Sequence, residues 1–298
     1  MPCIKMNRKM KLILIQLLML TRLSSWSQTD RVDSLLMDVM GNEIKTVTTT
    51  DTTHTSMALY GGLNYDSKSF YAGREVGDDM YNMNGYLFFF HSKGYFLGAS
   101  GSWYSQLDPG YSSTVLMGGY YKYLNKKKSL SFRTSYTRFI YYQPDPELNY
   151  NYNNSLSAGL SVKNKWIGGR FSSRLLFGKD VGMDLSPGIY SNIKLYKINK
   201  YDYISFEPEV SMLISTETIA YETSGNYNSR LPGTEEEFAT KDVYGLLNTQ
   251  LYLPLCITWR DFDLELSYTI NMPVTQDETV DYPVSSYFSV SFGYMIPF

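Results

Sequence analysis

The chain is poor in the side chains on which most enzymes and metal sites depend. It has two cysteines and two histidines, His54 and His91, in 298 residues. A serine nucleophile without a neighbouring base is a weak catalyst, and no cysteine or histidine spacing here resembles a zinc site. We therefore expect no enzymatic activity, no metal and no cofactor.

Long apolar runs are also missing. The longest, LILIQLLML from Leu12 to Leu20, has about nine residues, whereas a membrane-spanning helix needs roughly twenty. Basic residues precede this run and small residues follow it up to Ser27, which is the layout of a secretory signal peptide cleaved before Gln28. Residues 1–27 are therefore expected to be removed, which leaves Cys256 alone and no internal disulfide.

An excess of positive charge is absent from the rest of the chain. Residues 1–27 hold five of the 27 Lys and Arg residues and none of the 29 Asp and Glu residues, so the mature chain has 22 against 29 and a net charge of about −7. This balance gives no basic footprint for nucleic acid. Aromatic residues are abundant, with 28 Tyr and 15 Phe. Aromatic residues without a continuous apolar run indicate that apolar and polar residues alternate, as they do in strands.

From about residue 56 onward the chain repeats one unit, about ten residues of alternating character followed by a break. Short and long breaks alternate along the chain. Over about twelve strands, this alternation is typical of an all-β, up-and-down antiparallel transmembrane β-barrel. We expect a barrel over residues 55–298 and a separate segment over residues 28–54. The short breaks are 91–94, 125–129, 163–165, 198–202 and 259–262, and the long ones lie near 66–79, 107–113, 143–153, 179–188, 217–241 and 274–283.

Each strand has one apolar and one polar face. On residues 155–162, for example, Leu156 and Leu160 share the face expected to point outward, and Ser155 and Ser157 share the other. A soluble β-sandwich gives the same alternation. A membrane barrel is favoured because the second face is rich in Ser, Gly, Thr and charges, and because Tyr95 and Trp103 are spaced to reach the two borders of an apolar band about 25 Å tall.

The last strand, SSYFSVSFGYMIPF, carries its apolar residues on one face up to Phe298. A barrel has no free edge only if this strand pairs with the first. The terminal SFGYMIPF resembles the C-terminal signal of Gram-negative, Bacteroidota-like outer-membrane β-barrel proteins of the porin-like kind. The resemblance implies an outer-membrane location, contact with outer-membrane lipid, both termini in the periplasm, and recognition by the barrel-insertion machinery. The residues that carry it are Phe292, Tyr294, Ile296 and Phe298.

Charged side chains at inward positions predict a belt inside the lumen. A basic arc on the fifth to eighth strands is expected to face an acidic arc on the ninth to eleventh. Such a belt is either a pore constriction that selects ions or a set of salt bridges that fills the lumen. The belt residues are Arg133, Arg170, Arg174, Lys194, Glu207, Glu209, Asp263 and Glu265.

Three functions remain open at this stage. The leading one is a narrow porin-like channel for small polar or ionic solutes. The second is a closed structural or interaction barrel that acts through its loops or through residues 28–54, where Val32, Leu35, Leu36, Val39 and Met40 have helical spacing and form either a plug, a docking element or a loose tail. The third is an outer-membrane enzyme. The loop 217–241 is expected to fold inward or to bind a ligand, and its Glu235–Phe238 stretch either binds a cation or is a charged tip. Oligomeric state leaves no trace in the sequence.

Overall fold

The computed structural model describes residues 57–76, 79–108, 110–142, 152–199, 202–222, 238–274 and 282–298. The first 56 residues therefore lie outside the described part, and with them the expected signal peptide, the segment 28–54 and His54. All regular structure in the described residues is β-strand. Those residues include no helix that is long and apolar enough to cross a membrane.

Twelve strands form one closed antiparallel barrel, which confirms the predicted fold class and strand number. The order around the wall is β14-β13-β10-β9-β8-β7-β6-β5-β4-β1-β16-β15, and β15 pairs again with β14 to close the ring. The first and last strands pair from Ala58 opposite Pro297 to Asp66 opposite Ser289. The wall strands are β1 (Met57–Asp66), β4 (Asn82–His91), β5 (Tyr95–Tyr104), β6 (Tyr111–Tyr123), β7 (Leu130–Tyr141), β8 (Tyr152–Lys163), β9 (Ile167–Gly178), β10 (Val181–Ser191), β13 (Glu209–Glu222), β14 (Phe238–Trp259), β15 (Phe262–Pro273) and β16 (Ser285–Pro297).

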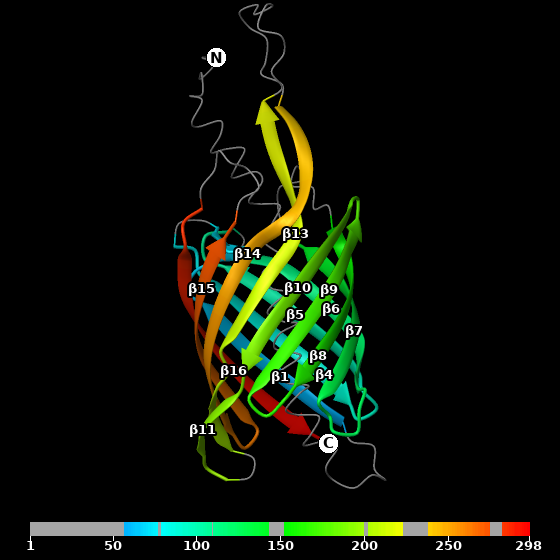
Figure 1. Cartoon of the computed structure of the whole chain (residues 1–298), viewed down its shortest axis with the longest axis vertical. Helices are drawn as coiled ribbons and strands as arrows, with labels where there is room; N and C mark the ends of the chain where they lie inside the picture. The colour runs from blue at the N-terminus through cyan, green and yellow to red at the C-terminus, as the bar shows by residue number, and fades with distance from the viewer. Residues whose placement is uncertain are drawn as a thin grey trace, which may run out of the picture.

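Two short strands extend the wall at one end. β11 (Ile193–Lys197) continues β10 after Asn192, and β12 (Tyr203–Phe206) precedes β13, from which Glu207 and Pro208 separate it. β12 pairs with the last residues of β14, and β11 pairs with β12. In Figure 1 this hairpin projects from the same end of the barrel at which the C-terminus lies.

The two ends of the barrel differ in their connections. At the end we call the turn end, residues 92–94, 124–129, 164–166, 198–202 and 260–261 join the strands. The opposite, loop end carries most of the longer connections, and there the β13–β14 ribbon, paired as far as Glu222 opposite Phe238, extends beyond the rim (Figure 1). The prediction of a long loop at residues 179–188 is wrong. β9 and β10 are joined by Lys179 and Asp180 alone, and residues 181–188 belong to β10.

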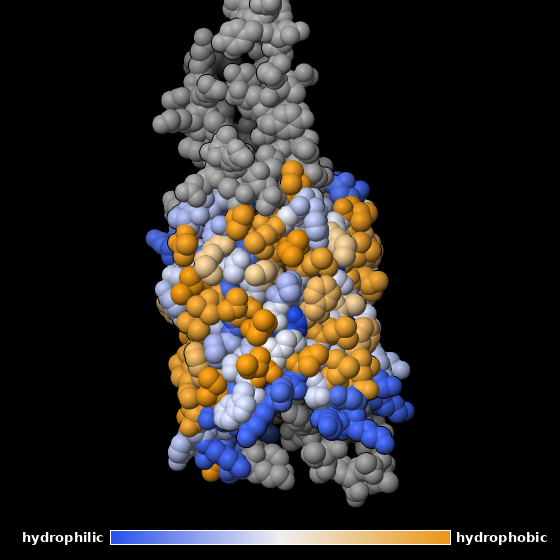
Figure 2. All heavy atoms as spheres, in the orientation of Figure 1, coloured by the Kyte–Doolittle hydropathy of each residue, from blue (hydrophilic) through white to orange (hydrophobic). Residues whose placement is uncertain are grey.

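The faces of the strands follow the predicted alternation. Leu97 is 64% exposed on the outside of β5 while its neighbour Phe96 is 1% exposed on the inside, and on β16 Phe292 is exposed while Ser291 is buried. Figure 2 shows the result on the face in view, a band of largely apolar side chains that gives way to hydrophilic ones at the turn end. An apolar outer band of this kind is the surface that a barrel presents to lipid.

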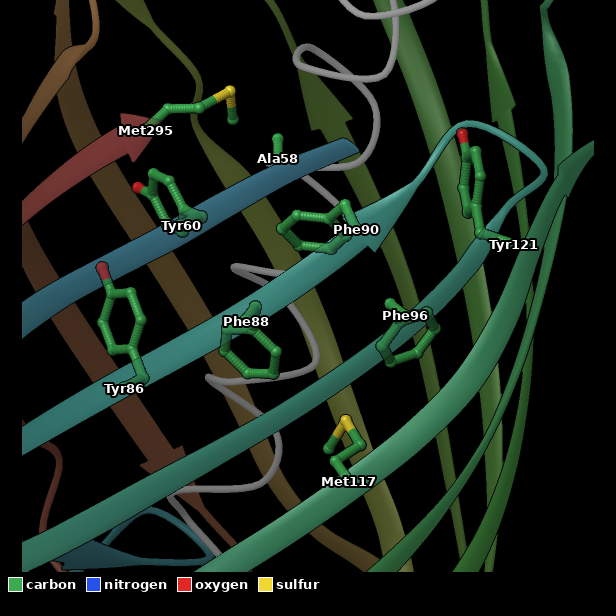
Figure 3. Packing of buried hydrophobic residues seen from close by; sticks show 9 residues of the cluster. All are labelled: Ala58, Tyr60, Tyr86, Phe88, Phe90, Phe96, Met117, Tyr121 and Met295. Carbon is green, nitrogen blue, oxygen red and sulfur yellow. The ribbon is translucent and has the colours of Figure 1, made fainter. Parts of the chain in front are cut away.

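Apolar side chains also gather inside the barrel, on the wall formed by β16, β1, β4, β5 and β6. Tyr60 stacks on Tyr86, with ring centroids 5.9 Å apart, and Phe88 stacks on Phe90 at 6.2 Å. Figure 3 shows these rings projecting from neighbouring strands into the interior. One side of the interior is therefore aromatic, in contrast to the polar inward face that the sequence predicts for every strand. The buried cluster comprises Ala58, Tyr60, Tyr86, Phe88, Phe90, Phe96, Met117, Tyr121 and Met295.

Candidate functional site: the lumen wall and its inward hairpin

A buried ion pair lies on the polar side of the lumen. Arg174 on β9 and Asp184 on β10 are opposite each other in the ladder, and Arg174 Nε donates to Asp184 Oδ2 at 2.9 Å. The Ser215 hydroxyl on β13 donates to the other oxygen of Asp184 at 2.6 Å. Both ionic side chains are less than 10% exposed. The two buried charges are tolerated because each one compensates the other.

A second ion pair crosses an intervening strand. Arg170 on β9 and Glu209 on β13 approach to 3.3 Å between Nη2 and Oε2, although β10 lies between their strands. The position on β10 that faces Arg170 is Gly188, and a Cβ there would lie 2.7 Å from Glu209 Oε1 and 3.3 Å from Arg170 Cγ. The absence of a side chain at Gly188 thus lets the pair form. The Arg170 guanidinium also lies 4.6 Å from the ring centroid of Tyr190, a cation–π distance.

Arg133 belongs to the same wall. It is 2% exposed on β7, and the positions that follow it around the ring are Gly159 on β8 and Ser172 on β9. Small side chains next to arginines leave room for the long guanidinium side chains on the inner face. The structure therefore places Arg133 on β7 and Arg170 and Arg174 on β9, with β8 between the two strands.

The acidic residues of the expected belt lie on β13, on β15 and between β12 and β13. Glu207 accepts hydrogen bonds from Asn192 and, at 3.0 Å, from Ser205. Glu265 accepts one from Tyr252, and Asp263 accepts one from Thr258 at 2.8 Å. Glu209 lies beside Arg170 along the wall, which corrects the expectation that it faces Arg170 across the lumen.

Lys194 does not join the belt. It is exposed on β11, outside the twelve wall strands, and its Nζ lies 4.7 Å from the ring centroid of Tyr203.

Asp184, by contrast, belongs to the charged wall and was absent from the sequence prediction. It was missed because residues 179–188 were interpreted as a long loop, so that its inward position on a strand was not considered.

The connection between β1 and β4 folds into the loop-end mouth of the barrel. It contains a small hairpin formed by β2 (Phe70–Tyr71) and β3 (Arg74–Glu75). Ala72 and Gly73, at its turn, both have positive φ, 47° and 81°, the conformation of a type I′ hairpin turn. Tyr71 and Ala72 are buried in one apolar cluster with Val115 on β6, Phe139 on β7, Leu176 on β9 and Leu247 on β14.

Those contacts place the hairpin across the lumen. β9 is five positions away from β4 around the ring, so a hairpin that joins the cluster containing Leu176 reaches the opposite wall. Gly73 packs so closely on Asn248 of β14 that a Cβ would overlap the amide of Asn248. Since a glycine also accepts the positive φ, no other residue type fits this position without strain.

Polar contacts fasten the hairpin at its base and tip. Lys68 Nζ donates to Glu75 Oε1 at 2.8 Å. This hydrogen bond raises the pKa of Lys68 above its usual 10.5, so Lys68 stays protonated and positively charged at neutral pH. At the tip, Ser285 Oγ donates to the carbonyl oxygen of Gly73 at 3.0 Å. Arg74 donates to the carbonyl oxygen of Val274 at 3.1 Å and its guanidinium lies 4.0 Å from the ring centroid of Tyr282.

The inward hairpin was missed by sequence reasoning, which assigned residues 66–79 to a loop without placing it and considered residues 28–54 and 217–241 as the segments that narrow the lumen. Both of those lie wholly or largely outside the described residues, as do Glu235, Glu236 and Glu237. A signal for the hairpin existed in the unusual apolar content of a loop that contains Phe70, Tyr71, Ala72 and Val76.

The remaining predicted residues occupy simple surroundings. His91 lies at the end of β4, where its Nδ1 accepts a hydrogen bond from the backbone N–H of Lys93 at 3.0 Å. In the described part of the chain no group of three or more His, Cys, Asp or Glu side chains is arranged to hold a metal ion. Phe292, Tyr294, Ile296 and Phe298 are exposed on the outer face of β16 and its terminus.

A closed antiparallel barrel with an apolar outer belt and a charged inner wall is a membrane-spanning β-barrel. No protein-family model and no curated protein sequence matches this chain. Solved structures similar to it include the KdgM porin, at 10% identity over 80% of this chain and 98% of the porin with a TM-score of 0.45. The NanC porin matches at 10% identity over 80% of this chain and 98% of the porin with a TM-score of 0.44, and an outer membrane channel from Pseudomonas putida F1 matches at 9% identity over 82% and 95% of the two chains with a TM-score of 0.41. At such identities a likeness concerns the fold, so the function is derived from the residues of this chain.

Proposed function

We propose that this protein is a narrow outer-membrane channel for small polar or ionic solutes. The observation that carries the proposal is the combination, in one lumen, of a charged wall on β7, β9, β10 and β13 with a hairpin that spans the mouth next to it. A packed interior needs no charge, and burying charge is costly, whereas a constriction lined by charges selects solutes by sign and size.

The location is part of the same proposal. The apolar belt requires a bilayer, and the aromatic terminus on the outer face of β16 supports recognition by the barrel-insertion machinery of an outer membrane, with both chain ends on the periplasmic side. Deletion of Phe298 is expected to lower the amount of folded barrel in membranes without changing synthesis. Heat-modifiable migration of membrane extracts measures this amount, and an unchanged yield contradicts the role of this residue.

A closed barrel that acts through its loops is the second candidate. Two observations favour it: both arginines on β9 form ion pairs within the wall, and aromatic side chains occupy the inner face of β1, β4 and β5. In this alternative the charges stabilise a filled interior, and removing them lowers stability without any effect on ions.

Single-channel conductance of the refolded chain in a planar bilayer tests the two candidates. Steady, ion-selective steps support a channel. A shortened protein that starts at Thr55 shows whether residues 28–54 act as a plug. If they do, its conductance steps are larger than those of the longer protein. Silence from both, with heat-modifiable migration confirming a folded barrel, overturns the channel. The variant Glu207→Gln/Glu209→Gln separates the candidates further, since a channel predicts altered ion selectivity and a filled lumen predicts lower stability.

A further inference from the structure

The outer rim of the turn end is strongly and one-sidedly basic. Every connection at this end carries or adjoins an exposed or half-exposed basic side chain. The exposed acidic residue among the described turn residues is Asp261, and the half-exposed carboxylates of the adjoining segments, Glu207, Asp263 and Glu265, accept hydrogen bonds from side chains of the wall. Asp202, the other carboxylate in these turns, is 5% exposed and accepts hydrogen bonds from the backbone N–H of Arg260 and from Asn199. The basic residues, which we call the basic rim, are Lys93, Lys122, Lys126, Lys127, Lys128, Lys163, Lys165, Lys194, Lys197 and Arg260.

The loop end has no such bias. Its described exposed or half-exposed charges are Lys68, Arg138 and Lys179 against Glu75, Asp79, Asp108 and Asp180, and Lys68 is already paired with Glu75. A chain whose mature net charge is negative therefore concentrates its positive charge at one end. Figure 2 shows the hydrophilic side chains gathered below the apolar belt at that end.

The basic rim borders the aromatic edge of the apolar belt. Lys165 Nζ lies 5.1 Å from the ring centroid of Trp166, and Arg260 Cζ lies 5.1 Å from that of Trp259. Both tryptophans are at least half exposed. Tryptophan and tyrosine settle at the level of lipid headgroups, so the neighbouring ammonium and guanidinium groups reach the depth at which headgroup phosphates lie.

We propose that the basic rim binds the headgroups of anionic phospholipids in the leaflet at the turn end. Positive side chains at an anionic surface gain about fivefold in affinity per residue, an effect that decays within a Debye length. The rim extends around most of the circumference, because its members lie on or next to all five connections of this end, and it therefore fits a lipid annulus better than a compact soluble partner. This inference does not depend on whether the lumen conducts.

The test compares lipid selectivity at the protein surface. The protein, purified from membranes and reconstituted in phosphatidylcholine, is probed with spin-labelled phosphatidylglycerol and spin-labelled phosphatidylcholine, and the ratio of their association constants is measured. The expected ratio for the unmodified protein is about two or higher, and it falls toward one in high salt.

Two charge-matched variants locate the effect. Lys126→Gln/Lys127→Gln removes two positive charges from the basic rim, and Arg138→Gln/Lys179→Gln removes two from the loop end. We expect the first to lower the ratio and the second to leave it unchanged. A ratio of one for the unmodified protein, or an equal fall in both variants, overturns the proposal. The salt dependence of the unmodified protein decides the question if a variant does not fold.

Discussion

Arg170 and Glu209 form an ion pair although a complete strand, β10, lies between the strands that carry them. The pair bridges Gly188, whose missing side chain opens the path. It lies along the wall, and its two partners come from strands that are not adjacent.

Neutralising one member of this pair is expected to leave the charge of the other uncompensated. Glu209→Gln therefore shifts ion selectivity toward anions, and Arg170→Gln shifts it toward cations. Reversal potentials under a salt gradient measure both. Asp180→Asn, a charge change on the connection at the loop end, is the control that leaves selectivity near its original value. Shifts of the same sign in both lumen variants contradict the arrangement.

Substitution of Gly188 tests the path of the pair. In Gly188→Ala the new Cβ would lie 2.7 Å from Glu209 Oε1, so the carboxylate has to move, and we expect a loss of about 1–2 kcal/mol of stability, as for overpacked sites. Gly169→Ala is the matched control, because the nearest atom to its Cβ is 3.8 Å away. Urea unfolding of the reconstituted barrel measures both variants, and equal stabilities show that the pair does not need the glycine.

The buried ion pair of Arg174 and Asp184 is expected to be tolerated only while both charges are present. Asp184→Asn leaves the arginine buried without its counter-charge, which costs about 3–5 kcal/mol. The double variant Arg174→Met/Asp184→Asn removes the stranded charge and should recover most of this loss. Unfolding midpoints of the three proteins check the prediction. If the double variant is no more stable than Asp184→Asn, the cost does not come from the arginine.

The inward hairpin is predicted to narrow the mouth of the lumen. Replacing residues 70–75 by two glycines removes Tyr71 and Ala72 from their cluster with Leu176 and is expected to increase single-channel conductance. Replacing residues 125–128, which lie in a connection at the turn end, by two glycines is the control and should leave conductance unchanged. Unaltered conductance in the hairpin variant, in a barrel that shows normal heat-modifiable migration, rules out the hairpin as the constriction.

Strand faces could be predicted from the sequence because they depend on local alternation. Leu97 and Phe96, or Phe292 and Ser291, are neighbours whose opposite environments follow directly from the period of two. The strand number followed from the alternation of short and long breaks, and closure followed from the need to avoid an open edge in lipid.

Positions that depend on tertiary contacts could not be predicted in this way. Residues 179–188 were interpreted as a long loop, yet Pro187 lies on β10, at a point where the ladder to β13 is interrupted between Leu185 and Gly188, as expected for a residue that has no N–H to donate. The ion pair of Arg170 with Glu209 and the docking of Tyr71 onto the far wall join residues distant in sequence. No local pattern encodes such contacts.

The closure of β1 on β16 has a consequence for the order of folding. Met57 and Phe298 exchange two backbone hydrogen bonds of 2.9 Å, which joins residues 241 positions apart. Contacts at such separation form slowly because a long loop must close first. Until β16 pairs with it, β1 has one open edge, and a strand with an open edge is prone to pair with other chains. A factor that shields β1 during this interval would protect the chain from aggregation.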